Sequence, residues 1–372
     1  MRLHCRQLIA TSLLLASTVV LHATMLNAQP PTKGKDAKKS ANGDSSPVIK
    51  VAKPSPFFQS ETPIAVTFTT NLKQLRRDKG ETSPWHAATV TIVDSTGKSI
   101  VVPATAKTRG IWRLKNCEFP PVRWKFTGAD TKGTLLHELH EPKLVSYCRN
   151  SDMYEQYILQ ELMLYRVYRL LTPVSHQARL MRMTYVDSAS GKVDATRYGF
   201  LLEDPARVAQ RLSGKIVKTK GAGPDDLDTD LQTLTFLFEY MIGNTDFSFS
   251  GLHNTELVQK SNGDLLPIVF DFDYAGAVDA SYATSDPRMR SVHVRDRQFR
   301  GYCSNKAAYA KAADLFREKK DAIYALYADE IGRLLQPRTV KATLTYFDEF
   351  YHDIATPKDF ERHVMSDCLA TH

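Results

Sequence analysis

Four polar side chains in the second half of the chain have the types and spacing that chemistry requires. Asp246 and Asn254 lie in the turn-rich segment GNTDFSFSGLHN, and Asp271 and Asp273 come straight after the apolar run LLPIVF. Clustered carboxylates repel one another unless water, hydrogen bonds or a metal ion neutralises their charge. Carboxylate and amide oxygens, completed by phosphate oxygens, are ligands that Mg²⁺ prefers. The pattern therefore indicates a divalent-cation site.

The aspartates at 271 and 273 carry most of this argument. Val269 and Phe270 have the apolar character of a buried strand, so the two aspartates share one face if the strand continues. Two buried like charges need a compensating cation. A plainer interpretation stays open, in which one aspartate caps a turn and the other is solvated.

The order of these residues along the chain is that of a phosphotransferase site. A helix is followed by a loop aspartate, an asparagine, a hairpin and a further aspartate. In kinase-like enzymes the first aspartate accepts the proton of the attacking hydroxyl. The asparagine and the later aspartate hold Mg²⁺ against the nucleotide phosphates.

Strand-like alternation dominates the first half of the chain. β-branched and aromatic residues recur there at period two between turn residues, which predicts a series of strands. The expected strands cover residues 62–70, 87–94, 99–110, 120–127, 141–148, 178–187 and 196–204.

Helical periodicity marks the remaining elements. Residues 151–173 carry one apolar stripe, with Ser151 or Asp152 as the N-cap. A second helix is expected over residues 225–243, because acidic residues crowd its start and Gly243 ends it. Two strands at 255–260 and 265–270 follow, and the chain is helical in composition from about residue 305.

The motifs, taken in order, resemble the CotH kinase family, the atypical kinases related to spore-coat protein H. The chain has TRG at 108–110, then PPVRWKF and EPKLV, the helix from Ser151, RYGFLLED, GNTDFSFSGLHN and PIVFDFD. The correspondence runs from about Ala104 to Ala277, roughly half of the chain. Ile111-Trp112-Arg113 stand where the family has small polar residues, and the chain has no Gly-rich phosphate loop.

The resemblance implies a fold. It predicts an α+β protein with a two-lobed, atypical protein-kinase-like fold. Its β-rich N-lobe with one long helix covers residues 57–204, and its helix-rich C-lobe, which carries the catalytic loop, covers residues 205–372.

The resemblance also implies roles in catalysis and metal binding. Asp246 would be the general base. Asn254 and Asp271 would bind Mg²⁺ (or Mn²⁺), with Asp273 assisting.

Nucleotide-binding roles follow in the same way. Lys125 or Lys143 would bind phosphate, with Glu155 or Glu161 as the ion-pair partner on the helix. The backbone near Leu202 and Glu203 would meet the adenine. Arg109 would steady the phosphates or the hairpin, or else be a structural arginine.

The N-terminus predicts export. Arg2 and Arg6, a short apolar stretch and LNA ending at Ala28 are typical of a secretory signal peptide over residues 1–28. An uncleaved anchor is the alternative. Residues 29–56 are rich in Lys, Ser, Pro and Gly and predict a disordered basic tether. We expect no transmembrane segment after the signal peptide, and a periplasmic or extracellular location.

Charge and cysteine content fit the same expectation. The net charge is +8, of which the signal peptide carries +2 and the tether +4, so the remainder is close to neutral and no nucleic-acid partner is expected. Four cysteines follow the signal peptide, which predicts two disulfides with three pairings left open; free thiols and a zinc site are the alternatives. These are Cys117, Cys148, Cys303 and Cys368.

The expected function is that of an exported kinase-like phosphotransferase. It would move a phosphoryl group from a Mg²⁺-bound nucleotide, with ATP as the expected donor, to a protein or glycan hydroxyl. A catalytically inactive, pseudokinase-like binding protein of the cell envelope is the alternative. A more distant one is a hydrolase with Asp246 and Asp271 as an acid/base pair.

Overall fold

The alternating segments of the first half form strands that close on themselves. The computed structural model describes residues 51–370 apart from 81, 94–95, 286–288 and 291. Within these residues the strand order is β1-β2-β3-β4-β5-β7-β6, a closed barrel. Its members are β1 (Ile64–Thr70), β2 (His86–Val93), β3 (Ser99–Thr108), β4 (Val122–Lys125), β5 (Lys143–Val145), β6 (Ala178–Asp187) and β7 (Val193–Leu202).

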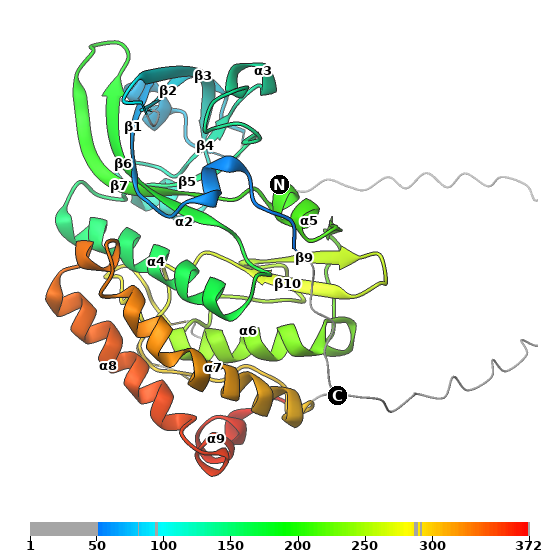
Figure 1. Ribbon diagram of the computed structural model, residues 1–372. Helices are drawn as coiled ribbons and strands as arrows, with labels where there is room; N and C mark the ends of the chain where they lie inside the picture. The colour runs from blue at the N-terminus through cyan, green and yellow to red at the C-terminus, as the bar shows by residue number, and fades with distance from the viewer. Residues whose placement is uncertain (1–50, 81, 94–95, 286–288, 291, 371–372) are drawn as a thin grey trace, which may run out of the picture. The chain divides into compact units, whose positions relative to one another are not determined.

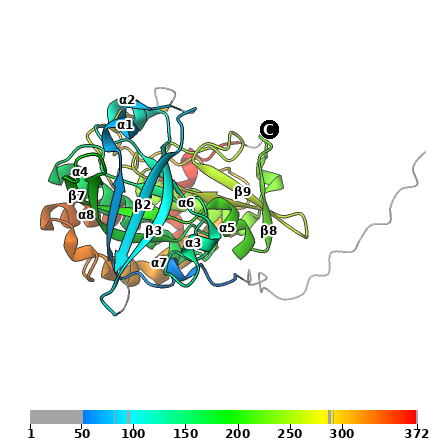
Figure 2. The same ribbon diagram turned by 90° about the horizontal axis from the view of Figure 1, so that it is seen from above.

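Closure of the barrel makes the predicted two-lobed kinase-like fold wrong. The barrel closes where β1 pairs in parallel with β6, from Ile64 opposite Met181 to Thr70 opposite Asp187. The other barrel pairs are antiparallel, and β2 and β3 run side by side on the barrel wall (Figure 2). Alternation indicates which residues are strands, but it does not say which strand edges meet across more than a hundred residues.

The second half of the described chain is also not simply helical. It contains a three-stranded sheet in the order β10-β9-β8, made of β8 (Gly214–Val217), β9 (Thr255–Lys260) and β10 (Leu265–Val269). Its longer helices are α6 (Thr229–Ile242), α7 (Lys306–Leu326) and α8 (Pro337–Asp353). Short elements complete the structure: α1 (Leu72–Arg77), α2 (Trp112–Asn116), α3 (Gly128–Thr131), α5 (Pro205–Arg211), α9 (Pro357–His363), and 3-10 turns at Pro56–Gln59, Pro224–Asp226, Gly332–Leu334 and Met365–Asp367.

Helix α4 (Asp152–Leu171) joins the two parts of the core. It packs against β6 and β7 on one side and against α7 on the other, between the barrel and the C-terminal helices (Figure 1). A helix covered on several sides buries more than a single apolar stripe, and most residues of α4 from Tyr154 onward are buried. Polar groups on this helix, including Glu161, are therefore carried into the interior.

Helix α6 ends where the candidate site begins. Asp228 caps its start by accepting a hydrogen bond from the backbone N–H of Leu231. Gly243 ends it with a φ of +66°, a left-handed conformation that glycine adopts at little cost. A Cβ at this position would lie 2.0 Å from the Tyr346 hydroxyl oxygen, so there is no room for a side chain and glycine is required.

The two predicted disulfides are confirmed. Cys117 pairs with Cys148, and Cys303 pairs with Cys368. Disulfides persist in oxidising compartments, so this pairing fits an exported protein. Within the described residues no helix has both the length and the apolar character needed to cross a bilayer.

The predicted signal peptide and most of the predicted tether lie outside the described residues. The last residues of the tether range are described, and the backbone N–H of Ala52 donates to the Arg211 carbonyl at 2.9 Å. The barrel, the small sheet and the helices fall within one compact unit, Ile49–His372.

Candidate functional site

The β9–β10 hairpin brings two of the predicted metal ligands together. Thr255 at the start of β9 lies opposite Val269 at the end of β10, so the chain enters and leaves the hairpin at the same place. There the backbone N–H of Phe270 donates to the Asn254 carbonyl at 3.1 Å. Asn254 and Asp271 both have left-handed backbones, with φ of +48° and +69°. Asn and Asp tolerate this region better than most residues.

Asp246 is bound to Asn254 directly. The Asn254 Nδ2 donates to the Asp246 carbonyl at 2.7 Å and to its Oδ2 at 3.0 Å. The other carboxylate oxygen, Oδ1, lies 2.8 Å from His253 Nε2. The Asp246 side chain is 43% exposed, so a substrate hydroxyl can reach it from solvent. This geometry suits a general base that is held in place by its neighbours.

The loop of Asp246 is supported from the inside by Asn244. Asn244 Oδ1 accepts from the backbone N–H of Asp246 at 3.0 Å, and its Nδ2 donates to Glu239 Oε2 at 2.9 Å. On the other side, Arg300 Nη1 donates to the carbonyls of Thr245 and Phe247, each at 2.6 Å. Burial raises the pKa of Glu239 to about 8, although the bond from Asn244 and the charge of Arg300 oppose the shift.

Asp273 reaches the same site by a route that differs from the expectation. Strand β10 ends at Val269, so Asp271 and Asp273 do not extend it as a common face. The Tyr165 hydroxyl instead accepts from the backbone N–H of Asp271 at 2.8 Å, and the Tyr282 hydroxyl donates to Asp273 Oδ2 at 3.0 Å. Burial and the charge of Asp271 raise the pKa of Asp273 to about 7.

Glu161 adds a third carboxyl group from α4. It is 1% exposed, and neither of its carboxylate oxygens has a hydrogen-bond partner among the described residues. Burial, Asp273 and Asp271 raise its pKa well above the ordinary value, while Arg113 and Arg109 oppose the rise. Glu161, Asp271 and Asp273 are together called the acidic cluster below.

Basic side chains border the acidic cluster. Burial lowers the pKa of Arg109, which follows β3, and the charge of Asp271 opposes this shift. The Nε atoms of Arg109 and Arg113 are buried without a hydrogen-bond partner among the described residues. Such donors suit an anionic ligand such as phosphate.

Lys143, at the start of β5, is the buried member of the two predicted lysines. It is 12% exposed and its Nζ lies 3.6 Å from Glu256 Oε1, on β9. The Nζ also lies 4.4 Å from the centre of the Phe270 ring. Burial lowers the pKa of Lys143, while Glu256 and, more weakly, Asp271 raise it. Its ion-pair partner is therefore on the hairpin rather than on helix α4.

The remaining predicted residues make contacts of their own. Lys125 is exposed and lies 3.2 Å from Glu141 and 5.4 Å from the centre of the Trp85 ring. Glu155 binds Arg182 at 2.7 Å and accepts from the backbone N–H of Tyr198. Their predicted roles in nucleotide binding stay predictions.

Glu203 is likewise engaged within the protein. Its carboxylate accepts from Arg211 at 2.9 and 3.1 Å and from the backbone N–H of Gln177. Its backbone N–H donates to the Gln177 carbonyl, and its carbonyl lies 3.0 Å from His176 Nδ1. The backbone expected to meet adenine is thus already hydrogen-bonded.

The donor set fits a divalent cation in its chemistry. Glu161, Asp271 and Asp273 influence one another's charge, and the pKa values of Glu161 and Asp273 are raised because both are buried beside like charges. A cation would relieve that repulsion. Among the described residues, however, no three or more His, Cys, Asp or Glu side chains are placed to hold a metal ion together. The Mg²⁺ site therefore stays a prediction.

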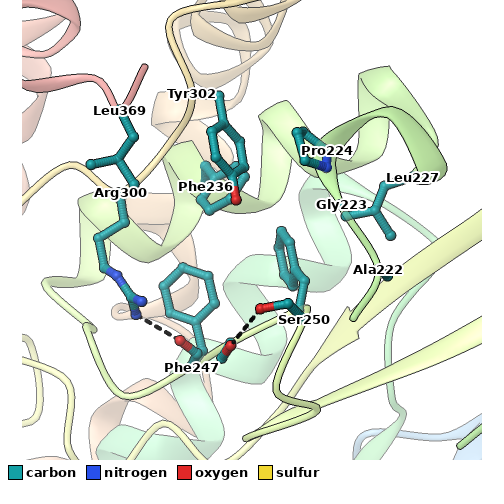
Figure 3. A pocket seen from close by; sticks show the side chains of 12 residues that line it. Ala222, Gly223, Pro224, Leu227, Phe236, Phe247, Ser250, Arg300, Tyr302 and Leu369 are labelled. Atoms are coloured by element: carbon teal, nitrogen blue, oxygen red, sulfur yellow. Dashed lines mark hydrogen bonds between the residues drawn. The ribbon is translucent and has the colours of Figure 1, made fainter. Parts of the chain in front are cut away.

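A small pocket of about 80 Å³ borders the same loop (Figure 3). Aromatic side chains and serines of residues 247–250 line it together with Arg300, Tyr302 and Leu369. Asp246, Asn254, Asp271 and Asp273 are not among its lining residues. The pocket is thus distinct from the acidic cluster.

Sequence reasoning missed several residues that shape the site. Asn244 and Glu239 hold the Asp246 loop, and Tyr165 and Tyr282 hold the segment after β10. Asn244, two positions before Asp246 in GNTD, was the available signal, because Asn commonly bonds the backbone two residues on. The tyrosines lie 106 and 9 positions from their partners, so local sequence gives no sign of the former contact.

Comparison with known proteins adds no family to this description. No family model matches the chain, and no curated protein matches it.

Proposed function

We propose that the protein transfers a phosphoryl group from a Mg²⁺-bound nucleotide to a hydroxyl group. The single observation that carries the proposal is the contact of Asn254 with Asp246 beside the buried acidic cluster. The resemblance to the CotH kinases supports the proposal only through the order of these residues along the chain. It lends no support through the fold, because the strands close into a barrel. The disulfides support placing this activity outside the cytoplasm.

Asp246 acts as the general base in this proposal. It accepts the proton of the acceptor hydroxyl while the bond from that oxygen to phosphorus forms and the bond from phosphorus to the nucleoside diphosphate breaks. Two contacts from His253 and Asn254 orient the carboxylate. The Glu239–Asn244 contact fixes the loop that presents it.

Asn254, Asp271 and Asp273 would hold the cation. When bound, Mg²⁺ would neutralise charge on the phosphates and position them. Arg109 and Lys143 are the side chains proposed to bind the phosphate oxygens, because both lie near Asp271 and both are shielded from water. Shielding strengthens their attraction for an anion.

A second candidate is a binding protein without turnover. The observation in its favour is Glu203, whose backbone N–H and carbonyl are both engaged by residues 176 and 177. An adenine could not use these groups without displacing those contacts, so a nucleotide would bind in a different pose, one that does not lead to transfer. The two candidates differ in whether product forms.

The test uses the purified protein with radiolabelled ATP, Mg²⁺ and a mixture of protein and glycan acceptors. We expect label transfer that requires Mg²⁺ and falls at least about a hundredfold in Asp246→Ala, because general bases contribute about that much or more. Nucleotide binding, measured by thermal shift, should persist in that variant. Asp271→Asn should remove Mg²⁺-dependent nucleotide binding as well.

Asp264→Asn is the matched control, since it removes an exposed carboxylate from the turn between β9 and β10. It should leave both readouts unchanged. Nucleotide binding without transfer under any acceptor would favour the binding protein. Absence of both would overturn both candidates.

A further inference from the structure

Two large apolar side chains are exposed beside the acidic cluster. Ile111 is 70% exposed and Trp112 is 38% exposed, at the start of the short helix α2. They follow Arg109 and Gly110 directly. Exposed apolar side chains gathered at one place often mark a ligand site, and the proposed chemistry does not use these two.

Trp112 belongs to a group of four aromatic rings, here called the aromatic shelf: Trp112, Tyr154, Tyr274 and Tyr282. The Trp112 ring centre lies 5.2 Å from that of Tyr282 and 6.1 Å from that of Tyr274. Tyr154 stacks on Tyr282 at 6.0 Å. Tyr274 and Tyr282 thus pack against the tryptophan ring, Tyr154 supports Tyr282, and part of the tryptophan surface stays open to solvent.

The aromatic shelf is connected to the acidic cluster through Asp273. The Tyr282 hydroxyl donates to Asp273 Oδ2 at 3.0 Å. Lys143 instead pairs with Glu256, and the charge of Asp271 acts on its pKa. The shelf is therefore linked to the acidic cluster through Asp273, and the proposed phosphate-binding lysine through Asp271.

We propose that the aromatic shelf binds a sugar ring of a glycan that serves as the phosphoryl acceptor. This inference rests on the proposed function, and it narrows the acceptor from any hydroxyl compound to a carbohydrate. The donor's phosphates then lie toward Lys143, and the acceptor lies toward Tyr282 and Asp273.

The chemistry of a pyranose ring suits this surface. One face of the ring carries C–H groups that pack on an aromatic side chain, and its hydroxyls point outward from the ring edge. A tryptophan surface offers a large, rigid contact at low cost in conformational entropy. A ring seated there directs an edge hydroxyl toward neighbouring polar groups, of which Asp273 is bound to Tyr282 of the shelf.

The test measures sugar binding in the absence of nucleotide, so its result does not depend on phosphoryl transfer. The probe is the tryptophan emission of a Trp85→Phe variant, which leaves Trp112 and the fully buried Trp124. The titrants are N-acetylglucosamine tetramer, maltotetraose, adenosine and a Ser-rich peptide. We expect a saturable change with at least one tetrasaccharide. Isothermal titration calorimetry, which does not depend on tryptophan emission, should show binding at least tenfold weaker in Trp112→Ala and unchanged binding in Asp264→Asn.

Two variants separate a local effect from misfolding. Tyr274→Phe keeps the ring and should keep sugar binding, and Val101→Ala removes an exposed apolar side chain from strand β3 as a control. A response to adenosine or to the peptide alone, or no response to any titrant, would overturn the proposal. Sugar binding without phosphoryl transfer would sustain the shelf and count against the proposed function instead.

Discussion

Two buried glutamates, Glu161 and Glu203, show how differently this protein treats the same side chain. Glu203 is 2% exposed, and Arg211 and the backbone of Gln177 satisfy both of its carboxylate oxygens. Glu161 is 1% exposed, yet its oxygens have no hydrogen-bond partner among the described residues. One carboxylate completes the fold, and the other faces like charges.

The difference separates stability from function. A buried charge is tolerated when it is paired and hydrogen-bonded. Where a protein instead gathers unpaired carboxyl groups, their raised pKa values mark a functional site rather than a structural one. The acidic cluster is therefore where we propose that a ligand binds, whereas the Glu203–Arg211 pair is satisfied within the fold.

The largest expected effect comes from a substitution that breaks the Glu203–Arg211 pair. Glu203→Gln leaves Arg211 buried beside a neutral group, and the protein should lose about 3–5 kcal/mol of unfolding free energy. Urea denaturation with both disulfides intact measures this loss. The double variant Glu203→Gln/Arg211→Met removes both charges and should recover part of it. A loss below 1 kcal/mol in the single variant would show that the pair is not structural.

The next effect concerns Glu239, the buried carboxyl group behind the Asp246 loop. Its pKa is about 8 in the folded chain and near 4.5 when exposed, so between these values the folded chain keeps a proton that the unfolded chain releases. Stability should therefore fall as pH rises through this range, by about 1.4 kcal/mol per pH unit from this group.

Glu239→Gln removes that contribution and still lets Asn244 donate to the side-chain oxygen. The unfolding free energy of Glu239→Gln minus that of the parent protein should therefore increase from pH 5 to pH 7, because only the parent loses stability from this group. Other groups that titrate in this range cancel in the difference. A pH-independent difference would contradict the protonated state of Glu239.

Glu161→Gln makes the same change as Glu203→Gln, but at the glutamate whose oxygens have no hydrogen-bond partner among the described residues. Burial and the neighbouring aspartates raise the pKa of Glu161 well above its ordinary value, which favours the protonated acid, and the amide of glutamine resembles that form. Stability should change by no more than about 1 kcal/mol, within the range of a tolerated substitution. A loss as large as that of Glu203→Gln would show that Glu161 is ionised and paired.

The smallest expected effect comes from Lys125. Its contact with Glu141 is exposed, so Lys125→Ala should cost no more than about 1 kcal/mol in urea denaturation. It should also leave nucleotide binding unchanged, whereas Lys143→Ala should weaken it. Equal losses of nucleotide binding in the two variants would reverse the choice between these lysines.

Local patterns in the sequence predicted the elements well and their assembly poorly. The barrel strands, β9, β10, α4 and α6 with its Gly243 ending lie where periodicity and capping residues indicate, whereas β8 was not predicted. The parallel pairing of β1 with β6, which closes the barrel, depends on edges that meet across 100 or more residues and carry no local signature. This is why the kinase-like fold was wrong although its elements were in order.

The candidate site was also predicted in part. Asn254 and Asp271 stand at the two ends of one hairpin, which is a local structure, so the sequence was sufficient to place these two residues close together. The condition that the strand continues through Asp273 is not met, because the strand ends at Val269 and Asp271 adopts a left-handed backbone. Arg113 comes from a distant segment, and only the fold brings its charge to act on Asp273, whereas Tyr282 lies nine positions further along the chain.

The most direct test of the central claim is a titration with Mn²⁺ followed by electron paramagnetic resonance, since Mn²⁺ replaces Mg²⁺ at oxygen ligands. We expect one bound Mn²⁺ per chain in the presence of a non-hydrolysable ATP analogue. Binding should be lost in Asp271→Asn and retained in Asp264→Asn. If the parent protein binds no Mn²⁺, or if Asp271→Asn binds it equally well, the acidic cluster is not a cation site and the proposed phosphoryl transfer has no centre.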